Sequence, residues 1–131
     1  MLLIDTNIYS GLAKGDVQLV NLVKTVNEIG IPLPVIAELR YGFAKGAQAE
    51  RNEQSLLKFL LQPQISIVSP TLETSVFYAQ IQLICSQKGK TLSHNDIWIA
   101  ALARENGCRL ATFDKDFAVL RDLFGDDLIL L

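Results

Sequence analysis

The chain has few of the residues that build zinc sites or serine-hydrolase triads. Among its 131 residues there are two cysteines and one histidine. Cys85 and Cys108 lie too far apart for a zinc-binding motif, and His94 alone supports neither a zinc cluster nor a Ser–His–Asp triad. We therefore expect the two cysteines to be buried or half-buried free thiols.

The chain also lacks long apolar runs, the features of a signal peptide and an excess of basic residues. No apolar run approaches the length of a membrane-spanning helix, and the start MLLIDTN has neither a basic stretch nor a small-residue cleavage site. These observations predict a cytoplasmic protein with no membrane partner. The net charge of −2 excludes nucleic-acid binding driven by bulk positive charge. An RNA substrate would therefore require a metal ion and a local basic patch.

Short apolar runs alternate with longer amphipathic segments along the chain, and we expect one domain over residues 1–131. The runs predicted to be strands are 2–4, 31–34, 64–68 and 109–112, with 127–131 as an optional fifth. The segments predicted to be helices are 6–13, 17–29, 35–43, 48–61, 71–87, 93–106 and 114–124. This alternation predicts an α/β fold with three layers, α/β/α, around a central parallel sheet of four to five strands.

Four acidic side chains fall where such a fold would bring them together. Asp5 ends the first strand and Asp114 follows the fourth, so both lie at the carboxyl edge of the sheet, where ligands bind in these folds. Glu38 and Asp96 lie early in helices that reach the same edge. Such a cluster of carboxylates is costly to hold together unless a cation neutralises it.

A divalent metal ion is the simplest source of that neutralising charge. Carboxylate oxygens suit Mg²⁺ or Mn²⁺, and a metal-bound water can attack a phosphodiester bond. The pattern therefore predicts a metal-binding, catalytic set consisting of Asp5, Glu38, Asp96 and Asp114. Short polar side chains beside the acids are predicted to orient them or a bound water: Thr6, Asn7 and Thr112.

Each acid also has a simpler interpretation when it is taken alone. Asp5 is a good helix N-cap, and Asp96 suits the positive end of a helix dipole. Glu38 can pair with a neighbouring arginine or face solvent, and Asp114 or Asp116 can cap the helix that follows them. The metal-site hypothesis depends on all four acids occurring together.

Four segments give the chain a family resemblance: IDTNI at 4–8, AELRYG at 37–42, NDIWIAALARENG at 95–107 and LATFDKDF at 110–117. In this order and spacing they resemble PIN domains, and closely the VapC-type ribonuclease toxins of toxin–antitoxin pairs. The resemblance implies that Asp5, Glu38, Asp96 and Asp114 bind metal, with Asp116 as an auxiliary acid. It also implies Mg²⁺- or Mn²⁺-dependent endonucleolytic cleavage of RNA, a homodimer, and a cognate antitoxin that covers the active site.

Several basic residues are candidates for contact with RNA phosphates. Lys88 and Lys90 lie in the loop before the helix of Asp96, and Arg40, Lys45 and Arg51 are further candidates. For each of them, a solvated surface charge is the favoured interpretation. For self-association, the apolar faces of the helices over 48–61 and 71–87 are the candidate surfaces.

Other functions are compatible with parts of this pattern. A PIN nuclease that processes RNA without a toxin role would carry the same four acids, and a non-catalytic module would bind RNA or protein only. A phosphatase using Asp5 as nucleophile usually has a second carboxylate two residues later, where this chain has Asn7. Such a phosphatase also leaves Glu38 without a role.

Overall fold

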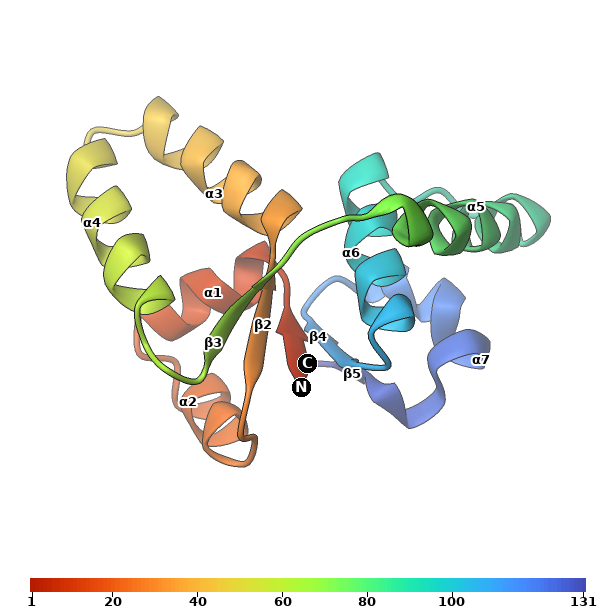
Figure 1. The fold of residues 1–131 in the computed structure, drawn as a ribbon, viewed down its shortest axis with the longest axis horizontal. Helices are drawn as coiled ribbons and strands as arrows, with labels where there is room; N and C mark the ends of the chain where they lie inside the picture. The colour runs from red at the N-terminus through yellow and green to blue at the C-terminus, as the bar shows by residue number, and fades with distance from the viewer.

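A five-stranded parallel sheet forms the centre of the structure (Figure 1). The computed structural model describes residues 1–131. The strands lie in the order β3-β2-β1-β4-β5, and every neighbouring pair is parallel. Their bounds are Leu2–Ile4 (β1), Ile29–Pro32 (β2), Ile65–Val68 (β3), Arg109–Thr112 (β4) and Leu128–Leu130 (β5). The predicted parallel sheet is confirmed, with five strands.

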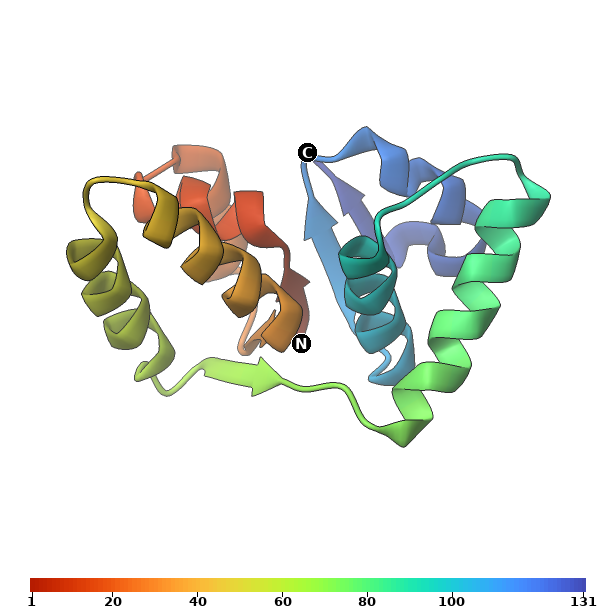
Figure 2. The same cartoon turned by 90° about the horizontal axis from the view of Figure 1, so that it is seen from above.

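Helices cover both faces of the sheet and complete the predicted three-layer α/β/α arrangement (Figures 1 and 2). Their bounds are Thr6–Ala13 (α1), Val17–Lys24 (α2), Leu33–Lys45 (α3), Ala49–Leu60 (α4), Leu72–Gln87 (α5), His94–Glu105 (α6) and Arg121–Phe124 (α7). Helix α6 has six buried residues and packs against α5, its neighbour in sequence. No helix is both long and apolar enough to cross a bilayer.

Strand β1 lies in the middle of the sheet and positions the candidate site. Its residues Leu2, Leu3 and Ile4 are fully buried, as expected for a strand covered on both faces. From β1 the chain builds β2 and β3 on one side and then β4 and β5 on the other. Ligands of open α/β sheets bind at such a switch point, beyond the carboxyl ends of the strands. Asp5 follows β1 and Thr112 ends the adjacent β4, so both lie at this point.

The second strand begins earlier than the sequence pattern predicts. We expected a helix over 17–29 and a strand over 31–34, but α2 ends at Lys24 and β2 spans Ile29–Pro32. The apolar residue Ile29 pairs with both neighbouring strands instead of extending the helix. The pattern was misleading because a buried parallel strand has no period of its own that separates it from a preceding helix.

Gly30 lies inside β2, at a position with little room for a side chain. A Cβ atom at this position would lie 2.6 Å from Met1 Sδ and 2.9 Å from Leu3 Cδ1. Both distances are shorter than carbon and sulfur atoms tolerate without rearrangement. Both atoms lie near the ends of flexible side chains, so a residue larger than glycine here would require Met1 and Leu3 to shift.

Two other predicted boundaries also differ in the structure. Pro34 belongs to the first turn of α3 and not to the strand, since a helix does not need the amide hydrogen of its first residues. The helix predicted over 114–124 is a 3₁₀ helix over Lys115–Leu120 followed by the short α7. A second 3₁₀ turn, Gly125–Asp127, leads into β5.

Candidate active site

Four carboxylates line one hollow at the carboxyl edge of the sheet. The hollow has a volume of about 260 Å³, and no Lys or Arg lines it. The acids come from the turn after β1, from α3, from the first turn of α6 and from the turn after β4. They are Asp5, Glu38, Asp96 and Asp114, and the rest of the lining is Thr6, Asn7, Ser93 and Ile99. The structure thus brings together all four acids that the sequence singled out.

Asp5 is both a helix cap and a pocket residue. Its Oδ1 accepts a hydrogen bond from the Ile8 amide at 3.2 Å, which caps α1. Its Oδ2 accepts a hydrogen bond from the Thr112 hydroxyl. Burial raises the pKa of Asp5 despite these two donors, and the charge of Asp114 raises it further. Asp5 therefore caps α1, as one interpretation of the sequence predicted, and also lines the hollow. The two roles use the same carboxylate and do not exclude each other.

Glu38 is fixed by two donors from other segments. Thr6 Oγ1 donates to Glu38 Oε2 at 3.0 Å, and Asn95 Nδ2 donates to Glu38 Oε1 at 2.6 Å. Thr6 thus occupies the supporting position that the sequence predicted. Asn95 was not predicted, although it directly precedes Asp96 in the segment SHND. Both oxygens of the Glu38 carboxylate are held in place from α1 and α6.

Asp96 lies in the first turn of α6, which begins at the cap residue Ser93. The Ser93 hydroxyl accepts a hydrogen bond from the Asp96 amide at 3.1 Å. Burial, together with the charges of Asp114, Glu38 and Asp5, raises the pKa of Asp96 to about 6. The hollow therefore disfavours the ionised form of this carboxyl, which is the situation that a bound cation reverses.

Thr112 links two of the acids. Its hydroxyl donates to Asp5 and accepts a hydrogen bond from the Asp114 amide at 3.0 Å. The Asp114 carboxylate in turn caps the following 3₁₀ helix by accepting from the Asp116 amide at 2.9 Å. The side chain of Asp116 is exposed and does not line the hollow. An auxiliary role for Asp116 remains a prediction.

Replacing Thr112 tests this link. Thr112→Val removes the side-chain donor of a buried carboxylate, and we expect a loss of about 1–3 kcal/mol in the free energy of unfolding. Thr112→Ser keeps the hydroxyl and is expected to lose less. Urea unfolding at pH 7 measures both variants, and a Val variant as stable as the Ser variant would contradict the proposed link.

The donor set of the hollow suits a hydrated divalent ion. No three of the His, Cys, Asp and Glu side chains approach one point closely enough to ligate an ion together. Mg²⁺, however, keeps several of its waters and binds through one or two carboxylates, so it does not require such a cage. All charged donors around the hollow are carboxylate oxygens, which hard cations prefer. The residues present therefore fit a water-retaining divalent ion.

The predicted RNA-contact residues lie outside this hollow. Arg40 makes a bidentate pair with Glu53, with a shortest distance of 2.6 Å. Lys88 Nζ donates to Asp122 Oδ2 at 3.0 Å and to a backbone carbonyl. Lys90 is exposed. Contact with RNA remains a prediction for these three and for Lys45 and Arg51, and Arg40 and Lys88 are already engaged by carboxylates.

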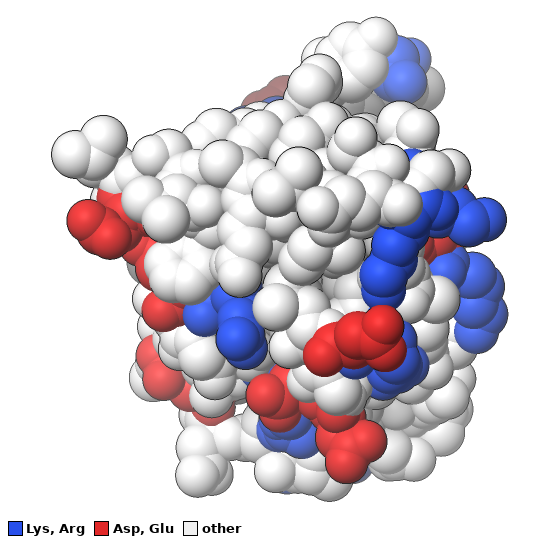
Figure 3. Space-filling model, turned by 90° about the vertical axis from the view of Figure 1, so that its right-hand side faces the viewer, with Lys and Arg blue, Asp and Glu red and all other residues white.

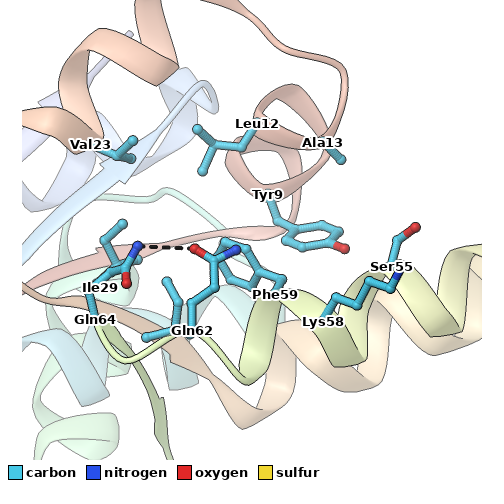
Figure 4. Close-up of a pocket in the computed structure, with 11 residues that line it drawn as sticks. Tyr9, Leu12, Ala13, Val23, Ile29, Ser55, Lys58, Phe59, Gln62 and Gln64 are labelled. Atoms are coloured by element: carbon cyan, nitrogen blue, oxygen red, sulfur yellow. Dashed lines mark hydrogen bonds between the residues drawn. The ribbon is translucent and has the colours of Figure 1, made fainter.

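Two further hollows lie beside α1. The larger, of about 430 Å³, is mainly apolar and lies between α1, α4 and the start of β2 and β3 (Figure 4). In it the rings of Tyr9 and Phe59 meet edge to face at a centroid distance of 5.1 Å. No carboxylate lines it, so it is not the candidate active site. The other, of about 370 Å³, opens between α1, α3 and α4, and six of its nine lining residues are polar or charged. We call it the polar hollow.

The comparison with protein families decides the membership of this chain. The model of the PIN domain matches residues 2–123, which include all four pocket acids. The chain belongs to the PIN-domain family. The resemblance seen in the four sequence segments is therefore confirmed, and this PIN domain has the expected fold.

Known VapC proteins are similar to this PIN domain. Ribonuclease VapC2 of Rickettsia felis is 31% identical over 98 residues, which are 74% of this chain and 72% of that protein. The crystal structure of VapBC2 from R. felis, bound to a DNA fragment from their promoter, has a TM-score of 0.80 and 25% identity, covering 99% of this chain and 96% of that chain. A toxin–antitoxin complex from Klebsiella pneumoniae has a TM-score of 0.69 and 22% identity, with coverages of 90% and 91%, and shares the fold.

Proposed function

We propose that this PIN domain is a divalent-metal-dependent endoribonuclease and that residues 1–131 act as one nuclease domain. The observation that carries the proposal is the hollow lined by four carboxylates and by no basic residue. Such a hollow attracts a divalent cation and, through it, the phosphate of a substrate. The similarity of the chain to a protein named ribonuclease VapC2 supports RNA as the substrate. Mg²⁺ or Mn²⁺ is the ion that we propose, because the donors are hard oxygens.

In this proposal the chain holds and orients the four carboxylates around the ion site, which are Asp5, Glu38, Asp96 and Asp114. One or two of them would bind the ion directly, and the others would contact its waters. When bound, the ion supplies Lewis acidity toward the phosphate and lowers the pKa of a water nucleophile. The Thr112 hydroxyl keeps one carboxylate oxygen of Asp5 in place. Thr6 from α1 and Asn95 from α6 each hold one carboxylate oxygen of Glu38. These donors reduce the reorganisation that the acids would otherwise need when substrate enters.

We further propose that the protein is the toxin of a toxin–antitoxin pair, acting in the cytoplasm, where its RNA substrate is found. Similarity to VapC2 and to the toxin–antitoxin complex supports this role. A cognate antitoxin is the protein partner that we propose. The apolar hollow between α1 and α4 offers such a partner a place to anchor a hydrophobic side chain (Figure 4).

Inducible expression in a bacterium without the antitoxin tests the toxin role. We expect the wild-type protein to arrest growth and Asp5→Asn to leave growth normal at the same protein level. The Asn side chain keeps the helix cap while removing the charge. Normal growth with wild-type protein that cleaves RNA in vitro would favour the RNA-processing nuclease instead.

We also propose a homodimer, formed through the outer face of α5. Leu72, Val76 and Leu83 are 87%, 63% and 58% exposed on this helix. Their spacing places them along one side of it. Glu73 is the only charged residue in α5, and Figure 3 shows a broad area without charged side chains on this side of the molecule. Exposed apolar stripes of this kind mark association surfaces.

Charge introduced into this stripe is expected to give a monomer. Val76→Lys and Leu83→Lys would each place an ammonium group in the dimer contact. Burying such an unpaired charge is unfavourable and is expected to weaken the dimer. Val17→Lys, on the exposed side of α2, is the matched control because Val17 is 73% exposed. Size-exclusion chromatography with light scattering at micromolar concentration measures the mass. A monomeric wild-type protein, or dimeric α5 variants, would contradict the proposed interface.

A further inference from the structure

The polar hollow beside α1 carries positive charge and no negative charge. Its volume is about 370 Å³, and its lining includes Lys14 from the end of α1 and Arg51 from α4. Ser10, Asn52 and Ser55 add hydroxyl and amide groups, and no Asp or Glu is among the lining residues. In a chain with a net charge of −2, two basic side chains gather here with no acidic side chain among the lining residues. Such a hollow suits an anion with several acceptor oxygens.

Both cations are free to bind a ligand. The two ion pairs of the protein are Arg40–Glu53 and Lys88–Asp122, so neither Lys14 nor Arg51 takes part in one. Glu53 shares α4 with Arg51, but its carboxylate is held by the bidentate contact to Arg40. Both free side chains are exposed. Glu50 also lies on α4, next to Arg51, but it does not line the hollow. Burial and the charge of Glu53 raise the pKa of Tyr9, which lines the hollow, so α4 offsets part of the positive charge but places no carboxylate in the lining.

Helix α1 connects the polar hollow with the acidic hollow, which is the candidate active site lined by Asp5, Glu38, Asp96 and Asp114. Thr6 lines the acidic hollow, whereas Ser10 and Lys14 line the polar one. The three residues are spaced four apart, so they form one stripe along the helix. The Ser10 hydroxyl donates to the Thr6 carbonyl at 3.1 Å. Eight residues of helix correspond to about 12 Å, a distance that a single RNA strand covers within a few nucleotides.

We propose that Lys14 and Arg51 form a phosphate-binding subsite for the RNA strand, beside the site of cleavage. This inference rests on the proposed ribonuclease function and adds to it the path of the substrate. The cleaved phosphate lies at the acidic hollow, and a flanking phosphate of the same strand lies between Lys14 and Arg51. Because the net charge is negative, overall charge does not attract RNA to this protein, and phosphate contacts must come from a local pair of basic residues such as this one.

RNA binding measured as a function of salt tests the subsite. The probe is a fluorescently labelled single-stranded oligoribonucleotide with Mg²⁺, and Asp5→Asn is the background that prevents cleavage. Adding Lys14→Gln and Arg51→Gln is expected to weaken binding roughly 20-fold at about 0.1 M salt. The slope of log affinity against log salt is expected to fall in magnitude by about 1.4, which is two contacts of about 0.7 each.

The matched control removes one lysine and one arginine elsewhere. Lys24 ends α2 and Arg104 lies in the last turn of α6, and neither lines a hollow near α1. Lys24→Gln with Arg104→Gln is expected to leave the salt slope unchanged. Equal slopes for the two double variants would overturn the subsite, because net charge alone would then explain the effect. Circular dichroism checks that both variants are folded.

Cleavage kinetics separate this inference from the function on which it rests. In the active protein, Lys14→Gln with Arg51→Gln is expected to raise KM for a long RNA and to leave kcat unchanged. KM for a dinucleotide, which has no flanking phosphate, is expected to stay the same. Wild-type protein that cleaves no RNA refutes the proposed function. Wild-type protein that cleaves RNA with the same KM as the double variant refutes the subsite alone.

Discussion

Asp96→Asn is expected to abolish RNA cleavage and, at the same time, to make the metal-free protein more stable. Burial and the charges of Asp114, Glu38 and Asp5 raise the pKa of Asp96 to about 6, so at pH 7.5 the carboxyl is ionised at a cost in folding free energy. Asparagine has nearly the same shape but no charge, which removes this penalty. The loss of one metal-binding carboxylate is expected to lower the rate roughly 1,000-fold, the equivalent of several kcal/mol.

Two measurements on one variant make this prediction specific. Cleavage of RNA in Mg²⁺ gives the rate, and scanning calorimetry at pH 7.5 with EDTA gives the melting temperature. Asp126→Asn is the control, because Asp126 is exposed and does not line the acidic hollow. We expect it to change neither quantity. Lower stability for Asp96→Asn would indicate that this carboxylate supports the fold, contrary to the raised pKa.

Cleavage is expected to fall about tenfold for each pH unit below 6, because Asp96 must lose its proton before a cation can bind. The stability of the metal-free protein has the opposite dependence on pH. Between about pH 4 and pH 6 the folded state keeps the Asp96 proton while the unfolded state has lost it. The free energy of unfolding therefore decreases as pH rises through this window.

Thermal unfolding with and without Mg²⁺ checks the pH dependence. At pH 7.5, metal at about 100 times its dissociation constant is expected to add about 2.7 kcal/mol to the free energy of unfolding. At pH 5 the same concentration is expected to add much less, because protons compete for the carboxylates. A metal effect that is equal at both pH values would show that the ion binds away from Asp96.

Much of the acidic hollow could be predicted because its residues follow from where strands end. Asp5 and Asp114 each come after a short apolar run, and in a parallel sheet such positions meet at one edge. Glu38 and Asp96 were predicted less directly, from their places early in helices. The four family segments added specificity because each contains one of these acids. The parallel sheet itself followed from the alternation of apolar runs and amphipathic segments.

Other features required three-dimensional contacts that no local pattern carries. Asn95 donates to Glu38 across 57 residues, and an asparagine beside an aspartate has many common roles. The close approach of Gly30 to Met1 and Leu3 depends on the pairing of β2 with β1, which sequence spacing does not show. Arg51 was a candidate for RNA contact, but it lines the same hollow as Lys14 only because α1, α3 and α4 pack together. Sequence spacing gives no measure of such distances.

The central claim is that the four-carboxylate hollow cleaves RNA with the help of a divalent metal ion. Its most direct test is the incubation of a mixed pool of structured RNA with purified protein in Mg²⁺ or Mn²⁺, with and without EDTA. Asp96→Asn, purified in the same way, controls for contaminating nucleases. We expect cleavage with metal, no cleavage in EDTA, and recovery when excess Mg²⁺ is added back. Cleavage that persists in EDTA, or equal cleavage by Asp96→Asn, would contradict the claim.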